Sequence, residues 1–501
     1  MIPSGPSAAA PDPRRWFVLV AIALAIFLGT IDGSIVNVAL PTFVDDFDTT
    51  FAAVQWIVLA YLLTQATLVL GIGRLGDIVG KKRIFTTGFA VFTIGSVLAG
   101  LSPSIGWLIG FRVVQGIGSA MIFALGFAIV ADAFDARERG RALGINGTAV
   151  SAGIITGPIV GGLILEAVDW RWIFFVNLPI GVLGILAAVR FVPRDHPRGG
   201  QRFDFAGAVA FFVTTAAFLS SLTVGQDVGF GHPGVVGGFV LAAVGLIAFV
   251  SLERIVDDPM LDLALFKIRT VTAGLVAAFT VFVAVSGLLL ILPFYLTDAL
   301  GYGPRNVGLL LAAIPASLGI VSPVAGALSD RLGTRPVRAA GLTILLAGLC
   351  GAFVTLNTGT SVATFVATGL VIGVGIGVFQ SPNNAAVLGE SPRERLGVVS
   401  GALTVTRLSG SMTGVAVLGT VWATIATRAA GGTPAANAPP TALVTGLHGA
   451  VAVAAILVAI GLGTVLIAWR RDVADGAVAL STGSPGAPPP GPGTDLRRPR
   501  S

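Results

Sequence analysis

Long apolar runs alternate with short polar segments along almost the whole chain. Fourteen runs are long enough to cross the hydrocarbon core of a bilayer, because about 20 helical residues span it. The pattern therefore predicts an all-α membrane protein with fourteen transmembrane helices, at about 16–40, 52–73, 83–102, 106–131, 141–166, 172–192, 203–224, 234–254, 271–297, 305–328, 337–356, 361–385, 396–424 and 446–470. The ends of the chain, 1–15 and 475–501, are rich in small residues and Pro, and we expect them to be disordered cytoplasmic tails.

Composition and charge support this pattern. Only 11% of the 501 residues are charged, whereas soluble domains carry about 25%. The net charge of +6 does not indicate nucleic-acid binding, because the cations lie in loops between apolar runs. With a cytoplasmic N-terminus, 26 of the 31 Lys and Arg residues lie inside, 3 outside and 2 within helices. The positive-inside rule then predicts a multi-pass protein of the cytoplasmic (inner) membrane with both termini in the cytoplasm.

A short loop sequence occurs twice. The stretch GRLGDIVGKKR (73–83) is repeated as GALSDRLGTRP (326–336), each copy after the second helix of a set of six. The shared positions are Gly73, Asp77 and Gly80 in the first copy and Gly326, Asp330 and Gly333 in the second. This repeat predicts two six-helix pseudo-repeats, 16–192 and 271–470, with two inserted helices at 203–254. Repeated halves with a site between them are typical of secondary transporters.

The loop residues suggest two tasks. Gly80 and Gly333 permit a tight turn with positive φ. Asp77 lies where a helix ends, so its carboxylate suits a nearby cation or the positive end of another helix. Lys81, Lys82 and Arg83 fit the anchoring of topology and contact with anionic lipid headgroups.

Three ionisable residues lie well inside predicted helices: Asp32, Arg112 and Arg407. Such groups are costly in a bilayer unless they are paired or hydrated, so they mark candidate functional sites. Counting along their helices allows Asp32 and Arg112 to lie at one depth, so we expect Arg112 to be either the partner of Asp32 or part of the proton relay. A carboxylate that exchanges partners between conformations is a natural proton carrier. Arg407 is interpreted as a second relay, a counter-charge or a substrate contact.

Small and polar residues suggest helix contacts and a cavity. Gly153, Gly157 and Gly161 form one face of a helix, next to Pro158 and Gly162, which predicts close packing with a bend. Mixed amide and aromatic linings suit large amphipathic ligands. The candidate cavity residues are Asn37, Tyr61, Gln65, Gln115, Asn146, Gln380, Asn383 and Asn384. We identify no metal-binding cluster, nucleotide-binding loop or catalytic triad, so we expect a proton gradient rather than ATP or a cofactor to supply energy.

Five stretches in order resemble the major facilitator superfamily, and specifically its fourteen-helix drug:proton antiporter branch. They are IDGSIVNVALP (31–41), GRLGDIVGKKR (73–83), RVVQGIGSA (112–120), GIITGPIVGG (153–162) and WRWIFFVNLPIG (170–181). The resemblance implies alternating access, a gating role for Asp77 and Arg83, and an antiporter motif at 153–162. The second loop copy departs from the first, because Pro336 replaces a basic residue.

The expected function is therefore proton-coupled efflux of amphipathic or cationic drugs by a monomer, without enzymatic activity. Two alternatives remain open. One is a dedicated exporter of a single endogenous compound, such as an antibiotic, a siderophore or a lipid. The other is a non-transporting membrane sensor or lipid-handling partner built on the same fold.

Overall fold

The computed structural model describes residues 15–134, 136–193, 205–256, 263–390 and 396–481. The first half contains α1 (Arg15–Val38), α2 (Leu40–Asp46), α3 (Phe51–Val79), α4 (Lys81–Gly100), α5 (Ile105–Ala133), α6 (Ala136–Ala167), α7 (Trp172–Phe175) and α8 (Asn177–Phe191). The inserted pair is α9 (Phe205–Val228) and α10 (Pro233–Ile255). The second half contains η1 (Leu263–Lys267), α11 (Arg269–Phe294), η2 (Tyr295–Ala299), α12 (Pro304–Leu311), α13 (Ala313–Leu332), α14 (Thr334–Thr355), α15 (Val362–Gly389), α16 (Leu396–Ala429), η4 (Ala435–Asn437) and α17 (Pro440–Ser481).

Fourteen helical segments of the described chain are long and apolar enough to cross a membrane, which confirms the predicted fold class. Some boundaries differ. Two predicted single helices are each divided in two, as α7 with α8 and α12 with α13. The prediction that the C-terminal tail begins at 475 is wrong, because α17 continues to Ser481. The segment from 473 to 480, VADGAVAL, contains three Ala residues and one Leu, which favour helix. Residues 1–14 and 482–501 of the predicted tails lie outside the described residues.

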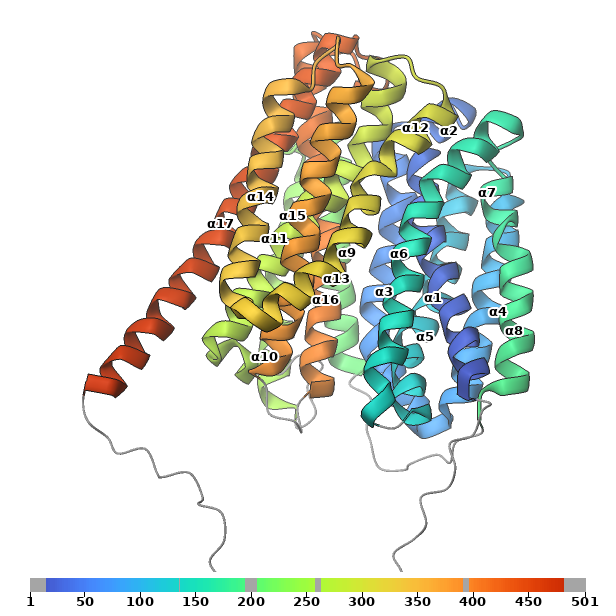
Figure 1. Ribbon diagram of the computed structural model, residues 1–501. Coiled ribbons are helices and arrows are strands. Elements are labelled where there is room, and N and C mark those ends of the chain that lie inside the picture. Colours follow the sequence, from blue (N-terminus) through green and yellow to red (C-terminus); the bar gives the residue numbers. More distant parts are fainter. Residues whose placement is uncertain (1–14, 135, 194–204, 257–262, 391–395, 482–501) are drawn as a thin grey trace, which may run out of the picture.

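The helices form two bundles, one from α1 to α8 and one from α11 to α17 (Figure 1). In the first bundle α1 packs on α6, and α5 packs on α3 and α4. In the second α11 packs on α16, and α15 packs on α13 and α14. We call the side where α1 begins and α17 ends the basal side, and the side that carries α2, α7 and α12 the apical side. Both ends of the described chain lie on the basal side.

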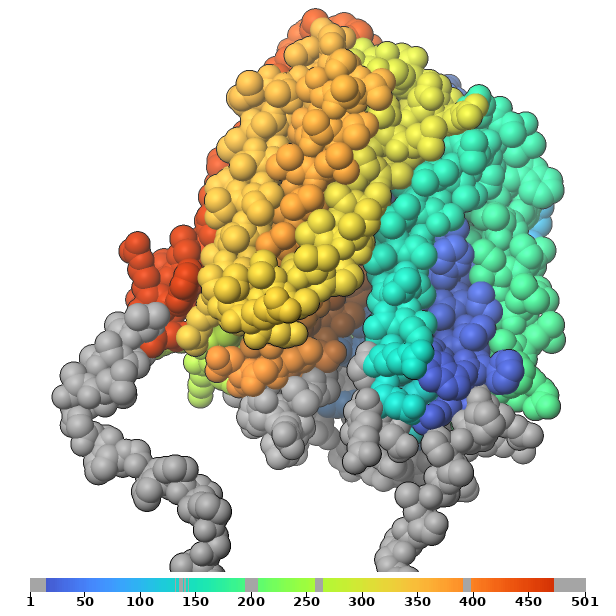
Figure 2. All heavy atoms as spheres, viewed as in Figure 1, coloured from blue at the N-terminus to red at the C-terminus, as the bar shows by residue number. Residues whose placement is uncertain are grey.

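The two bundles meet on the apical side. There α6 crosses α12, and the rings of Phe51, Phe294 and Trp422 form a cluster with centroids 4.7–5.5 Å apart. Figure 2 shows the surfaces of α6 and α13 joined toward the apical side and separated toward the basal side. The bundles therefore touch apically and part basally in this structure.

The inserted helix α9 lies against both bundles, on α3 and on α16. Its Gln226 Nε2 donates to Gln55 Oε1 of α3 at 2.9 Å and to Thr420 Oγ1 of α16 at 2.8 Å. Gln55 Nε2 in turn donates to the carbonyl of Val415 at 3.2 Å. Because Gln55 is fully buried, this group of hydrogen bonds joins three helices away from water.

We expect Gln226→Leu to lower the free energy of unfolding by about 1 kcal/mol, because it removes two interhelical hydrogen bonds and leaves Gln55 without its donor. Thermal or denaturant unfolding in detergent measures the change. Ser251→Ala is the matched control, since Ser251 bonds only to its own helix. An equal loss in both variants would contradict a bridging role for α9.

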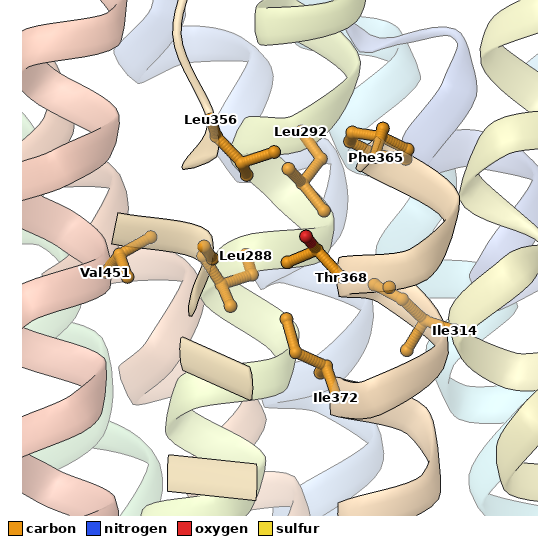
Figure 3. A pocket seen from close by; sticks show the side chains of 10 residues that line it. Leu288, Leu292, Ile314, Leu356, Phe365, Thr368, Ile372 and Val451 are labelled. Atoms are coloured by element: carbon orange, nitrogen blue, oxygen red, sulfur yellow. The ribbon is translucent and has the colours of Figure 1, made fainter. Parts of the chain in front are cut away.

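A small cavity lies inside the second bundle (Figure 3). Its walls are apolar except for Thr368, and they come from α11, α13, α14, α15 and α17. Since no helix of the first bundle contributes, this cavity does not lie between the two halves.

Candidate functional site

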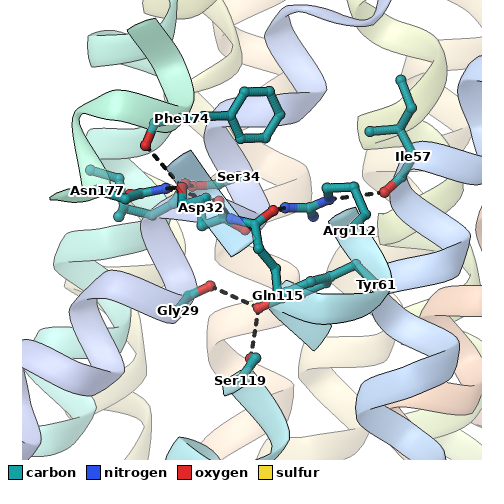
Figure 4. A network of polar contacts seen from close by, with 12 residues as sticks. Gly29, Asp32, Ser34, Ile57, Tyr61, Arg112, Gln115, Ser119, Phe174 and Asn177 are labelled. Atoms are coloured by element: carbon teal, nitrogen blue, oxygen red, sulfur yellow. Dashed lines mark hydrogen bonds and ion pairs between the residues drawn. The ribbon is translucent and has the colours of Figure 1, made fainter. Parts of the chain in front are cut away.

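Asp32 is the centre of a buried polar network in the first bundle (Figure 4). Its side chain on α1 is completely buried. Asp32 Oδ2 accepts a hydrogen bond from Arg112 Nη1 at 2.6 Å. Asp32 Oδ1 accepts from Gln115 Nε2 at 3.0 Å and from Asn177 Nδ2 at 2.9 Å. Three donors from two other helices therefore surround one carboxylate, as an ionised form requires.

Arg112 on α5 is held from several sides. Its Nε donates to the carbonyl of Ile57 at 3.0 Å, and its Nη1 also donates to Gln115 Oε1 at 2.9 Å. The guanidinium carbon lies 4.3 Å from the centre of the Tyr61 ring, a cation–π contact. The pair of Asp32 and Arg112, one of the two roles that the sequence analysis gives Arg112, is present, and Gln115 bridges its two members.

A second group of hydrogen bonds lies one turn toward the basal side, next to the first through the contact of Arg112 with the Tyr61 ring. Ser119 Oγ lies 2.7 Å from the Tyr61 hydroxyl and accepts from Gln65 Nε2 at 2.9 Å. The sequence analysis expects Tyr61, Gln65 and Gln115 to line a cavity, but they are buried within this network. Their amides and hydroxyl are therefore used inside the bundle and do not form an open wall.

Sequence reasoning missed three members of this network. Asn177 at the start of α8 joins Asp32 to Ser96 Oγ at 3.0 Å, and Ser96 donates to the carbonyl of Phe174 at 2.8 Å. Ser119 is the third. Asn177 belongs to the stretch WRWIFFVNLPIG, so its signal was an amide next to the break between α7 and α8.

The other predicted cavity residues lie in different places. Asn37 and Gln380 are half-buried. Asn146 is fully buried with neither side-chain polar atom hydrogen-bonded. Asn383 Nδ2 donates to the carbonyl of Gly274 at 3.1 Å. Asn384 Oδ1 accepts a hydrogen bond from Arg407. Both residues belong to the second bundle, so among the described residues Arg407 is not part of the Asp32 network in the first bundle.

The first loop copy makes the expected turn. Gly80 has φ 108° and is the single residue between α3 and α4. Lys81 Nζ lies 2.6 Å from Asp132 and 3.6 Å from Asp77. Arg83 is exposed, and a Cβ on Gly73 would meet no atom within 4 Å. Asp77 thus shares a cation with a second carboxylate.

The second copy has the same turn and different partners. Gly333 has φ 86° between α13 and α14. Arg335 Nη2 lies 2.9 Å from Asp472 of α17 and 3.7 Å from Glu390 at the end of α15. Asp330 is exposed. The two loops therefore have the same backbone turn, but their charged residues contact different helices.

The small residues of α6 make contact on two sides. Toward α1, Gly153, Gly157 and Gly161 face Thr30, Ser34 and Ile35, and Ser34 Oγ donates to the carbonyl of Gly153 at 3.2 Å. Toward α12, a Cβ on Gly162 would lie 2.5 Å from the carbonyl oxygen of Pro304. A Cβ on Gly308 of α12 would collide with the carbonyl oxygen of Pro158. Gly162 and Pro158 thus belong to the apical contact between the bundles.

Several curated proteins are similar to this chain. The riboflavin transporter RibZ of Clostridioides difficile is 32% identical over 388 residues, covering 77% of this chain and 83% of its own. The multidrug resistance protein Stp of Mycobacterium tuberculosis is 36% identical over 406 residues, covering 81% and 75%. The puromycin resistance protein pur8 of Streptomyces alboniger is 32% identical over 481 residues, covering 93% and 94%.

Among solved structures, a bacterial homologue of the human lysosomal transporter Spinster matches 92% of this chain and 98% of its own with a TM-score of 0.65. Its sequence identity of 19% supports the fold alone. The family model described as Major Facilitator Superfamily matches residues 22–415, and again 274–496. With this match over most of the chain, and with relatives that are named as transporters, the protein belongs to the Major Facilitator Superfamily.

Proposed function

We propose that the protein exports amphipathic compounds in exchange for protons, as a member of the fourteen-helix drug:proton antiporter branch. The observation that supports this most is the buried Asp32–Arg112 pair with its neutral hydrogen-bond partners. The names of the similar multidrug and puromycin resistance proteins are consistent with export. The name of the similar riboflavin transporter is consistent with a dedicated substrate.

Asp32 is the proton carrier in this proposal. Arg112 stabilises the ionised carboxylate, and burial disfavours it once the two separate. A conformational change that draws α1 away from α5 would therefore make Asp32 take up a proton. Ser119, Tyr61 and Gln65 form a separate polar group on the basal side of this pair, and a proton that leaves or enters on that side would pass it.

Alternating access follows from the two halves. We assign the basal side to the cytoplasm, because most cations of the chain lie in its loops. The apical contacts then close the outer side, and this structure is the inward-facing state. Moving to the outward-facing state requires α6 to part from α12, and the basal ends of the bundles to meet.

Asp77 is proposed to latch the basal side when it closes. In this structure it lies 3.6 Å from Lys81, which holds Asp132 more closely at 2.6 Å. Asp77 is therefore the carboxylate that can change partner at low cost.

We expect Asp77→Asn to fold and insert normally but to transport at least about tenfold more slowly, since one charge-assisted contact contributes about 1.5–3 kcal/mol. Asp132→Asn is the matched control, because it removes the other carboxylate from Lys81. Drug efflux from cells with equal amounts of each protein measures the difference. Equal rates in the two variants would contradict a latch role for Asp77 and would leave the loop with a role in membrane topology only.

The proposed function is tested with purified protein in liposomes under an imposed pH gradient. A panel of lipophilic dyes, puromycin and riboflavin is offered. We expect accumulation of at least one compound that follows the gradient and collapses with a protonophore. Accumulation that depends on ATP and ignores the pH gradient would overturn the proposal.

A further inference from the structure

The second bundle holds a charge that the proton pathway does not use. Arg407 lies in the middle of α16 and is half-buried. Arg112, the other arginine well inside a membrane-spanning helix, is paired with Asp32. No carboxylate of the described chain pairs with Arg407, whose Nε is buried without a hydrogen-bond partner. A cation without a carboxylate partner inside a membrane-spanning helix is costly, so a bound anionic group would be strongly favoured there.

The side chain of Arg407 is held in place by two other helices. Its Nη2 donates to Asn384 Oδ1 of α15. Its guanidinium carbon lies 5.6 Å from the centre of the Phe282 ring of α11. Three helices of the second bundle thus orient one guanidinium, and its Nη1 makes no hydrogen bond within the described chain.

The groups around this guanidinium offer donors. Arginine has no acceptor, so Asn384 must turn its oxygen toward Arg407 and its Nδ2 donor away. Gln380 stands one helical turn from Asn384 on α15 and is half-buried without a hydrogen bond in the described chain. Phe282 adds a half-buried aromatic surface. This combination suits a planar aromatic ligand with an acidic or electron-rich end.

Charge balance within the two halves favours the same ligand. The carboxylate of Asp32 is neutralised by Arg112 and enclosed in the first bundle. Asp32 therefore offers a cationic substrate no free negative charge in this state, whereas Arg407 offers an anionic one a positive charge. This differs from the cationic substrates expected from the sequence.

We propose that Arg407, Asn384 and Phe282 form a binding site for the anionic end of an aromatic substrate. Arg407 and Asn384 donate hydrogen bonds to a carboxylate, sulfonate or phosphate, and Phe282 contacts the ring system. The proposal rests on the proposed transport function for its biological meaning, but its test requires no proton gradient.

Fluorescein and rhodamine 123 provide the test, because they share a xanthene framework and carry opposite charges at pH 8. Binding is measured with purified protein in neutral detergent. We expect the protein to bind fluorescein at least about tenfold more tightly than rhodamine 123, and Arg407→Gln to lose that difference. Arg407→Lys should keep part of it. Arg428→Gln is the matched control, since Arg428 is exposed at the C-terminal end of the same helix.

A second variant makes the test independent of lost stability. Asn384→Asp places a carboxylate against Arg407, so we expect fluorescein binding to fall and rhodamine 123 binding to rise. Tighter binding of rhodamine 123 to the unaltered protein, or unchanged fluorescein binding in Arg407→Gln, would overturn the proposal. Displacement of fluorescein by dihexanoyl phosphatidylglycerol would also overturn it, by assigning the site to a lipid headgroup. Failure of gradient-driven transport with intact fluorescein binding would instead count against the proposed function alone.

Discussion

Replacing Asp32 by Asn is expected to abolish concentrative transport, with a loss of about 100-fold or more, because an amide cannot carry a proton at neutral pH. The amide oxygen can still accept hydrogen bonds from Gln115 and Asn177, whereas the amide nitrogen then faces the Arg112 donor, so only the Arg112 contact is lost. Exchange of substrate across liposomes without a gradient should survive in part. Uptake with and without an imposed pH gradient separates the two activities.

Stability has to be controlled in this experiment. Removing the charge of Asp32 leaves Arg112 buried and unpaired, which costs about 3–5 kcal/mol. The double variant Asp32→Asn with Arg112→Gln removes both charges and should restore stability without restoring coupling. Asp169→Asn is the control for a lost carboxylate, since Asp169 is an exposed partner of Arg171. Gradient-driven accumulation by Asp32→Asn at the normal rate would exclude Asp32 as the carrier.

The second large effect concerns the apical contact between the bundles. Gly308→Val places a side chain against the carbonyl oxygen of Pro158, and the backbone of Gly162 lies 3.1 Å from the added Cβ. Backbone atoms cannot move aside without shifting a helix, so the apical side should no longer close. We expect transport to fall about 100-fold or more, since the inward-facing state becomes inaccessible.

Spin labels measure this change directly. The exposed apical residues Leu101 and Val362 are replaced by Cys in a background in which the exposed Cys350 is replaced by Ser. Gly308→Val should lengthen the distance between the two labels. Gly351→Val is the control, because Gly351 is also in a helix but has open space at its Cβ position. An unaltered distance in Gly308→Val would show that this contact does not close the apical side.

The features that could be predicted from the sequence are those that carry a high energetic cost. Charged side chains within a bilayer and positive φ angles are both expensive, so the residue types alone distinguish Asp32, Arg112, Gly80 and Gly333 from their neighbours. Their contacts and backbone angles are as expected. The number of membrane-spanning helices could also be predicted from length and hydropathy, because polar residues within the bilayer are costly and each spanning helix therefore needs a long apolar run.

Neutral polar residues could not be assigned in this way. An Asn or Ser in a membrane helix costs little, and many form ordinary hydrogen bonds between helices. In the sequence Asn177 looks no different from Asn37, and only the break between α7 and α8 directs it at Asp32. The position of α9 between the bundles was equally hidden, because the Gln226 hydrogen bonds join residues that are 171 and 194 positions apart.

The direction of proton movement tests the central claim most directly. Liposomes that hold the purified protein and an internal pH indicator receive, from outside, a compound that the protein accumulates under a pH gradient. Downhill entry of the compound should drive protons out, so the internal pH should rise with the unaltered protein and stay constant with Asp32→Asn. A falling internal pH, no change while the compound enters, or an equal rise with Asp32→Asn would contradict proton antiport through Asp32.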